Sequence, residues 1–303
     1  MKLENHAYSG PISNNDPSLV IIGNKTIPSF HDQVNTWLSD STHLDPYNLQ
    51  NDVIGIEIGR NDVSASIPKI MNGTMTLDQL ATALGSNIAT DVGSLVRAGY
   101  KNIYVWNLPA IDNLPYITFL NLEALAKPLV DKPNNKIESD LQPVISQGVH
   151  LLDLEKLMNQ ALDPRVLAAM GITDSTHACD NMLANNTVVI CNNPDNYFFY
   201  NKIHPASRVH YLWGIVTSIY MRDPSHKFTV KEILQLIKTF DIGNSNVNNN
   251  LIVDGITGPE SSAIPSGSAT PTATGYSIAT GAPTNTAYPT VVPTSPAPAK
   301  CVK

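Results

Sequence analysis

The sequence lacks the features that mark several large classes of protein. Its formal net charge is −7 and its pI is about 5.5, so it has none of the basic excess that a nucleic-acid partner requires. No apolar run approaches the roughly 18–20 residues of a membrane-spanning helix, and no polybasic segment is present to hold an anionic membrane. GxGxxG and P-loop motifs are also absent. We therefore expect no nucleic-acid partner and no transmembrane segment.

Cysteine is scarce, with three residues in the whole chain. Cys179 and Cys191 lie in an Asn-rich stretch, and their spacing predicts a local disulfide and hence an oxidising compartment. The alternative is a pair of free, buried thiols. Cys301 is left over near the C-terminus. The segment Met1–Asn5 is polar and carries no apolar h-region, so we expect no signal peptide.

Three Asn-x-Ser/Thr sequons point to a secreted origin. They are Asn24-Lys25-Thr26, Asn72-Gly73-Thr74 and Asn185-Asn186-Thr187. Each pattern is common by chance, but together with the cysteine pair they favour a secreted ancestor. Because such an ancestor would carry a signal peptide, we expect that a segment is missing before Met1.

The composition changes sharply after about Asp254. Residues 255–303 hold eight of the 22 prolines, many Ser, Thr, Ala and Gly residues, and three charged residues. Such a segment buries too little apolar surface to offset its chain entropy, which predicts disorder. It is either an O-glycosylated stalk or a plain flexible linker. We therefore expect a main domain over residues 1–225, a helical extension over 226–254 and a disordered tail over 255–303.

Before the tail, segments with the apolar pattern of a β-strand alternate with segments that have the apolar spacing of an α-helix. Strands are predicted at residues 52–58, 102–106 and 149–154, and the first is apolar on both faces at its start, as a buried parallel strand should be. Helical spacing of apolar residues covers 76–99, 116–147 with interruptions near Pro128 and Pro133, 206–221 and 230–240. Strands separated by helices predict an α/β fold with a parallel sheet and helices on both faces.

Two loops at strand ends carry residues suited to stabilise an oxyanion. A glycine at position 10 can adopt a positive φ and offer its N–H to a ligand, although an ordinary turn glycine would look the same. Asn61 follows the strand at 52–58, where its amide can act as an oxyanion donor. The alternative for Ile58–Asp62 is a turn, because Gly, Asn and Asp are turn residues.

A third loop carries a candidate general base. The aromatic run at 197–200 leads into His204, and we expect Pro205 to occupy the first turn of the following helix. A histidine at that junction is well placed to accept a proton. The alternative is a surface or packing histidine.

Taken in order, these segments resemble the sequence blocks of the SGNH/GDSL hydrolases, particularly secreted esterases and lipases of the fungal type. The matching segments are Asn5–Gly10 for Asn-x-Ala-x-x-Gly, Gly59–Asp62 for Gly-x-Asn-Asp, Asn201–Pro205 for Asp-x-x-His-Pro and Trp106–Pro109 for an Asn-Leu-Pro segment. Cys179 and Cys191 match a cysteine pair common before the last block. The resemblance covers about residues 3–222.

The resemblance implies a three-layer α/β/α, flavodoxin-like fold and hydrolysis of acyl esters by a Ser-His mechanism. It makes His204 the base, puts Asn201 in the triad-acid position, and assigns Gly10 and Asn61 to the oxyanion hole. No metal and no organic cofactor is implied. The substrate would be a small-molecule, polysaccharide or lipid ester, and the protein would be a monomer, extracellular or attached to a cell wall.

Two departures from the family pattern lower the activity that we expect. The Gly-Asp-Ser nucleophile block is absent, and since four residues precede Asn5 we expect the central first strand to be missing and the chain to fold poorly. Asn201 stands where the family has Asp. A neutral Asn can stabilise the wrong histidine tautomer, and the corresponding change in a serine protease lowers the rate by about 10⁴.

Three residues are conceivable replacements for the missing groups. Asp195 could orient the histidine, Ser245 in Gly243-Asn244-Ser245 could be a permuted nucleophile, and Ser9 would need a rebuilt site. Neither serine lies in a G-x-S-x-G elbow. We therefore predict an ester hydrolase relative that is inactive as given. The alternative is a non-catalytic secreted or cell-wall-associated glycoprotein of the same descent.

Overall fold

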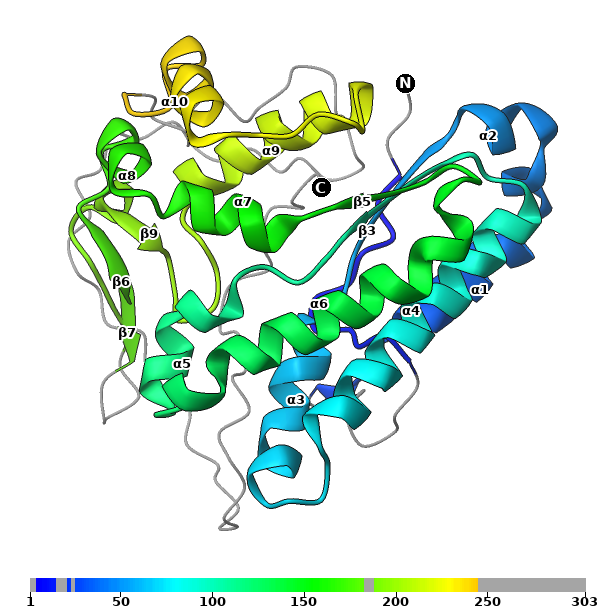
Figure 1. Cartoon of the computed structure of the whole chain (residues 1–303), viewed down its shortest axis with the longest axis horizontal. Coiled ribbons are helices and arrows are strands. Elements are labelled where there is room, and N and C mark those ends of the chain that lie inside the picture. The colour runs from blue at the N-terminus through cyan, green and yellow to red at the C-terminus, as the bar shows by residue number, and fades with distance from the viewer. Residues whose placement is uncertain (1–3, 15–20, 23–24, 183–187, 245–303) are drawn as a thin grey trace. The chain divides into compact units, whose positions relative to one another are not determined.

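The computed structural model describes residues 4–14, 21–22, 25–182 and 188–244 (Figure 1). Contacts divide this part of the chain into two compact units. The first unit holds the residues up to 112 and residues 122–158, and the second holds residues 113–121 and 159–244. The predicted tail at 255–303, with Cys301, lies outside the described residues. No helix in the described ranges is long and apolar enough to cross a membrane.

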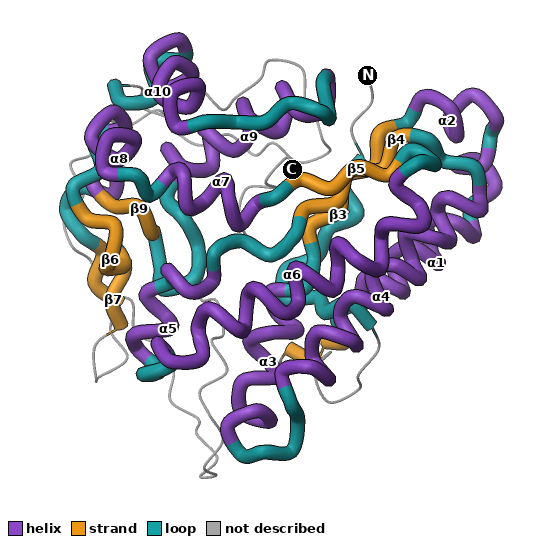
Figure 2. The backbone as a smooth tube through the Cα atoms, viewed as in Figure 1, coloured by secondary structure: helices purple, strands orange, loops and turns teal. Residues whose placement is uncertain are grey.

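The first unit contains a three-stranded parallel sheet (Figure 2). Its strands are β3 (Val53–Glu57), β4 (Asn102–Trp106) and β5 (Val149–Leu152), in that order. β4 pairs in register with both neighbours, and Ile103 and Val105 are fully buried. A short antiparallel pair, β1 (Ile21–Ile22) and β2 (Lys25–Thr26), is separate from this sheet. The α/β class and the parallel pairing predicted from the sequence are confirmed.

The prediction that β3 is buried on both faces is wrong. Val53 is 50% exposed, Gly55 and Glu57 are exposed, and Ile56 alone is buried, at 5%. β4 is the one strand that pairs with β3 among the described residues. β3 is therefore an edge strand here, and an edge strand needs apolar contacts on fewer sides than a central one.

Helices of the first unit form where a stripe of apolar residues at helical spacing lies between residues that cap the two helix ends. α4 (Leu77–Ala98) starts at a capping box between Thr76 and Gln79 and ends at Gly99, whose φ of 113° is left-handed. Its buried face packs along α6 (Glu123–Ile145), and the two helices run side by side in Figure 1. The other helical elements are α1 (Phe30–Ser39), η1 (Ser41–Leu44), α2 (Pro46–Asn51) and α3 (Arg60–Met71).

α6 runs through the prolines that were expected to interrupt it. Pro128, Pro133 and Pro143 all lie inside the helix. An interior proline removes one N–H donor and costs about 3 kcal/mol. A stripe of fully buried aliphatic residues, including Leu129, Val130, Ile137 and Leu141, offsets this cost, since burying each contributes about 1.5–3 kcal/mol. Tertiary packing thus overrides the local signal. The segment before α6 is a separate short helix, α5 (Pro115–Phe119).

The second unit combines short strands with four helices in its described residues. β6 (Asp174–Ala178) pairs in parallel with β9 (Tyr197–Phe199), and β7 (Asp180–Met182) pairs antiparallel with β8 (Val188–Ile190). The helices lying wholly in this unit are α5, α8 (Pro164–Met170), α9 (Ser207–Arg222) and α10 (Val230–Thr239), with η3 (Pro194–Asn196) between strands. The unit boundaries fall in η2 (Ile111–Asn113), between α5 and α6, and in α7 (Leu154–Ala161).

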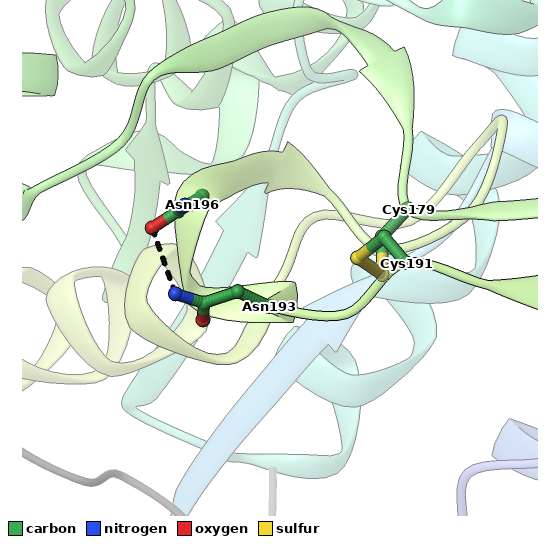
Figure 3. Close-up of a disulfide and its surroundings, with 4 residues drawn as sticks. All are labelled: Cys179, Cys191, Asn193 and Asn196. Atoms are coloured by element: carbon green, nitrogen blue, oxygen red, sulfur yellow. Dashed lines mark hydrogen bonds between the residues drawn. A yellow bond between two sulfur atoms is a disulfide. The ribbon is translucent and has the colours of Figure 1, made fainter.

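A disulfide joins Cys179 and Cys191, as the sequence predicts (Figure 3). Their Cα atoms are 4.9 Å apart, and the backbone N–H of Cys191 also donates to the carbonyl of Cys179. Just beyond the bridge, Asn193 donates its amide to the side-chain oxygen of Asn196 across 3.1 Å. The bridge therefore closes a local loop immediately before β9 and the loop that carries His204.

Candidate functional site

The first unit brings two of the candidate segments together. Gly10 has a φ of 90°, the left-handed region that glycine reaches without strain. The carbonyl of Pro11, the next residue, accepts a hydrogen bond of 2.8 Å from Nδ2 of Asn61. One of the two amide hydrogens of Asn61 is used in this way. The other remains available for a ligand, because Asn61 has no second partner for Nδ2 among the residues described.

Asn61 owes its position to the start of α3. Gly59 caps this helix with a φ of 116°, and a Cβ there would lie 3.0 Å from a side-chain carbon of Leu108 and 3.1 Å from Leu84. Only glycine satisfies both the backbone angle and the close packing. Asn61 is then the second residue of α3, directly after the exit from β3. A side chain at that point can serve a ligand at the end of the sheet.

Asp62 holds the segment after Gly10 through a second set of hydrogen bonds. Its carboxylate accepts the backbone N–H of Ser13 at 3.0 Å and the Ser13 hydroxyl at 2.6 Å, and Asn87 donates to that hydroxyl at 3.0 Å. Burial raises the pKa of Asp62, while the hydrogen bonds from Ser13 act in the opposite direction. Asn61 and Asp62 therefore hold residues 11–13 in place, and with them the peptide next to Gly10.

The second unit brings Asn201 and His204 together. The side-chain oxygen Oδ1 of Asn201 accepts the backbone N–H of Ile203 at 3.0 Å, the backbone N–H of His204 at 2.8 Å and Nδ1 of the His204 ring at 3.0 Å. In return, the His204 carbonyl accepts the backbone N–H of Tyr200 at 2.9 Å. The side chain of His204 is exposed, and that of Asn201 is half-buried.

These contacts fix the orientation of the amide and the tautomer of the ring. The two backbone groups that point at Asn201 are donors, so the end of the amide that faces them must be the oxygen. His204 Nδ1 then needs a hydrogen to bond to the same oxygen. In the neutral ring this leaves the lone pair on Nε2, which is the tautomer a general base requires. The expectation that Asn201 favours the wrong tautomer is therefore wrong for this geometry.

Pro205 does not occupy the first turn of a helix. α9 begins at Ser207, and Pro205 forms an isolated antiparallel bridge with Phe199. The backbone N–H of Ala206 also donates to Phe198 at 2.8 Å. These bonds keep the chain extended past the proline, so His204 lies in a tight loop between β9 and α9. The described residues before Gly10 do not form a strand either, so the expectation that Gly10 lies in a loop at the end of a strand is wrong.

No protein-family model matches the chain, and no curated protein matches it in sequence. Within the ranges described, no group of three or more His, Cys, Asp or Glu side chains is arranged to hold a metal ion.

The Asn-Leu-Pro segment after β4 forms a polar network that the sequence alone did not reveal. Asn107 caps the start of α7, because its Oδ1 accepts the backbone N–H of Leu154 at 2.6 Å. Asn134 on α6 bonds to both backbone groups of Leu108, at 2.8 Å and 3.1 Å, and donates to Glu155 at 2.9 Å. The sequence offered one indication of this network, because Asn134 is a polar residue within the apolar stripe of the predicted helix. Asn107 thus has a structural role within the described contacts.

The conceivable replacements for the triad acid and the nucleophile fall in different places. Asp195 lies 3.5 Å from Nη2 of Arg208, whereas the contact at Nδ1 of His204 is Asn201. Ser9 lies in the exposed segment before Gly10, and Ser245 lies outside the described residues. Gly10 and Asn61 belong to the first unit, and Asn201 and His204 belong to the second.

Proposed function

We propose that this chain belongs to the SGNH/GDSL type of ester hydrolase, with a flavodoxin-like α/β/α plan, and that its 303 residues do not by themselves hydrolyse esters. The observation that supports this proposal most directly is the contact between Asn201 and His204. The hydrogen bonds of Asn201 place the ring hydrogen on Nδ1, and hence the lone pair of a neutral ring on Nε2. The sheet with its parallel strands and the loops at their ends supports the same plan.

The resemblance to the SGNH/GDSL hydrolases assigns each candidate residue a part in the proposed acyl-transfer chemistry. A serine hydroxyl attacks the ester carbonyl while His204 accepts its proton at Nε2. The N–H of Gly10 and the amide of Asn61 donate to the oxyanion, in keeping with the positive φ of Gly10 and the second hydrogen of Asn61. Collapse of the oxyanion breaks the ester C–O bond, and the alcohol leaves with the proton that His204 had accepted. Water, activated by His204, then attacks the acyl-enzyme and frees the acid and the serine.

The missing step is the nucleophilic attack. The sequence contains no Gly-Asp-Ser, so no serine is assigned to it. Asn201 keeps the tautomer but is neutral, so it gives the protonated ring no charge to balance the one it acquires. This favours the second candidate function, a secreted or cell-wall-associated glycoprotein that binds acyl or acetyl esters of polysaccharides or lipids without cleaving them.

A fluorophosphonate probe distinguishes the two functions on the full chain. The protein and its His204→Ala variant are treated with the probe, and any adduct is located by peptide mass spectrometry. His204 is exposed, so its replacement is not expected to disturb folding. We expect no adduct on either protein, and near-UV circular dichroism is the control that establishes whether each protein is folded.

A labelled serine in the wild type that disappears in His204→Ala would overturn the claim of inactivity and keep the Ser-His mechanism. A serine labelled equally in both proteins would overturn the role of His204. The coding sequence upstream of the Met1 codon gives a second test. An in-frame Gly-Asp-Ser there supports the hydrolase, and a stop codon supports the binding glycoprotein.

A further inference from the structure

The turn between α3 and α4 carries a sequon in a geometry that the proposed ester chemistry does not use. Asn72, Gly73 and Thr74 are all exposed. Of the three sequons in the sequence, this is the one whose residues the structure describes throughout, since Asn24 and Asn185 lie outside the described residues. The turn belongs entirely to the first unit.

The side chains of this sequon are already organised. Asn72 caps the C-terminal end of α3, and its Oδ1 accepts the backbone N–H of Thr74 at 3.0 Å and the Thr74 hydroxyl at 2.6 Å. The hydroxyl therefore polarises the amide through its oxygen. Within the described residues, Nδ2 of Asn72 makes no hydrogen bond. It is thus the atom of the turn that can take a new substituent without breaking a contact.

The turn also has room for a large group. Gly73 has a φ of 74°, and a Cβ added there would meet nothing within 4 Å. Met71, the residue before the sequon, is 53% exposed. A bulky hydrophilic substituent on Asn72 would project into solvent and shield this apolar side chain without entering the core. The buried face of α4 begins only at Leu80.

We propose that Asn72 is N-glycosylated. Nδ2 forms a bond to the anomeric carbon of a lipid-linked oligosaccharyl diphosphate, the bond from that carbon to the phosphate oxygen breaks, and the lipid diphosphate leaves. Nδ2 loses one proton to a base of the transferase. The disulfide between Cys179 and Cys191 is independent support, because it indicates the oxidising compartment in which such donors are used. The proposal holds whether or not the chain acts on esters.

Secretion and peptide mapping test the modification directly. The full chain is expressed behind a secretion leader in a eukaryotic host, and the peptide containing Asn72 is analysed before and after digestion with peptide N-glycosidase, which converts a glycosylated asparagine to aspartate. We expect a glycopeptide that, after digestion, carries aspartate in place of Asn72. Thr74→Ser should retain the glycan because the hydroxyl remains. Thr74→Ala should lose it although Asn72 is unchanged.

One result overturns the proposal: an unmodified Asn72 peptide from wild-type chain that is folded and has its disulfide closed, as near-UV circular dichroism and non-reducing mapping would show. A glycan on Asn72 that persists in Thr74→Ala would overturn the role assigned to the Thr74 hydroxyl. If a variant is retained in the cell, the same peptide from the membrane fraction gives the same reading. Glycans at Asn24 or Asn185 leave the Asn72 peptide unaffected and so do not confuse the result.

Discussion

Oδ1 of Asn201 accepts a hydrogen bond from Nδ1 of His204 across 3.0 Å, and it accepts the backbone N–H of the same histidine at 2.8 Å. The backbone contact determines which end of the amide faces the ring, so a neutral side chain selects the tautomer that an aspartate would select. Orientation of the ring and compensation of a positive charge on it are thus separable properties. This loop provides the first without the second.

Asn201→Ala should release the His204 ring from the Nδ1–H tautomer. The change removes the shared acceptor of three donors, so the neutral ring should shift towards Nε2–H, and stability should fall by about 1 kcal/mol. The measurement is the pair of ring ¹⁵N chemical shifts of His204. Asn201→Asp is the matched control, because it keeps an oxygen at the same place. An Nδ1–H form that survives in the alanine variant would contradict the assigned role.

Asp62→Asn should change the pH dependence of stability. Burial raises the pKa of Asp62 above 3.8, so the folded chain binds more protons than the unfolded chain, and the contribution of Asp62 to stability falls as pH rises through the raised value. Unfolding by urea between about pH 4 and about pH 7 should show this decline in the wild type and less of it in Asp62→Asn. The variant keeps an oxygen for the Ser13 hydroxyl.

Asp163→Asn is the control for this prediction. Hydrogen bonds from the Arg165 side chain and backbone lower the pKa of Asp163 to about 2, below the range of the experiment. Its contribution is fully present above 3.8 and is lost only as pH falls towards 2. The Asp163→Asn variant should therefore keep the wild-type slope. Equal slopes in all three proteins would mean that Asp62 is not the group that responds.

Asn134→Leu should be strongly destabilising because it removes a buried polar side chain that serves the backbone. It leaves the N–H and the carbonyl of Leu108 buried without their partner, at about 1–3 kcal/mol for each group. Asn51→Leu is the matched control in the same unit, because Asn51 is exposed and its bond to the Tyr47 carbonyl is open to water. Urea midpoints should fall for Asn134→Leu and stay nearly constant for Asn51→Leu. Similar midpoints would contradict the structural role of Asn134.

Elements with strong local signals were predicted closely from the sequence. The strand at 102–106 has the predicted bounds, and α4, α9 and α10 lie within one residue of theirs. The signals were apolar periodicity together with caps such as Thr76 and Gly99, both of which act over one or two turns. The exposed face of β3 and the continuity of α6 depend on which elements pack against them, and no local pattern encodes that.

In the candidate site, too, local features could be predicted from the sequence, whereas contacts between distant residues could not. The loops that carry Asn61 and His204 could be located because they follow strands, and the segment that carries Gly10 could be located by its residue types alone. The bond from Asn61 to Pro11 joins positions 50 residues apart, and that from Ser13 to Asp62 spans 49, so sequence spacing gave no sign of either. The shared acceptor on Asn201 is local, but its effect depends on backbone geometry.

The exposed edge of β3 has a consequence for how the chain behaves in concentrated solution. A strand of this composition, paired along one side among the described residues, presents backbone groups that can template pairing with another molecule. Shelf life and handling of the purified protein should therefore depend on its concentration, even where the folded state itself is unchanged.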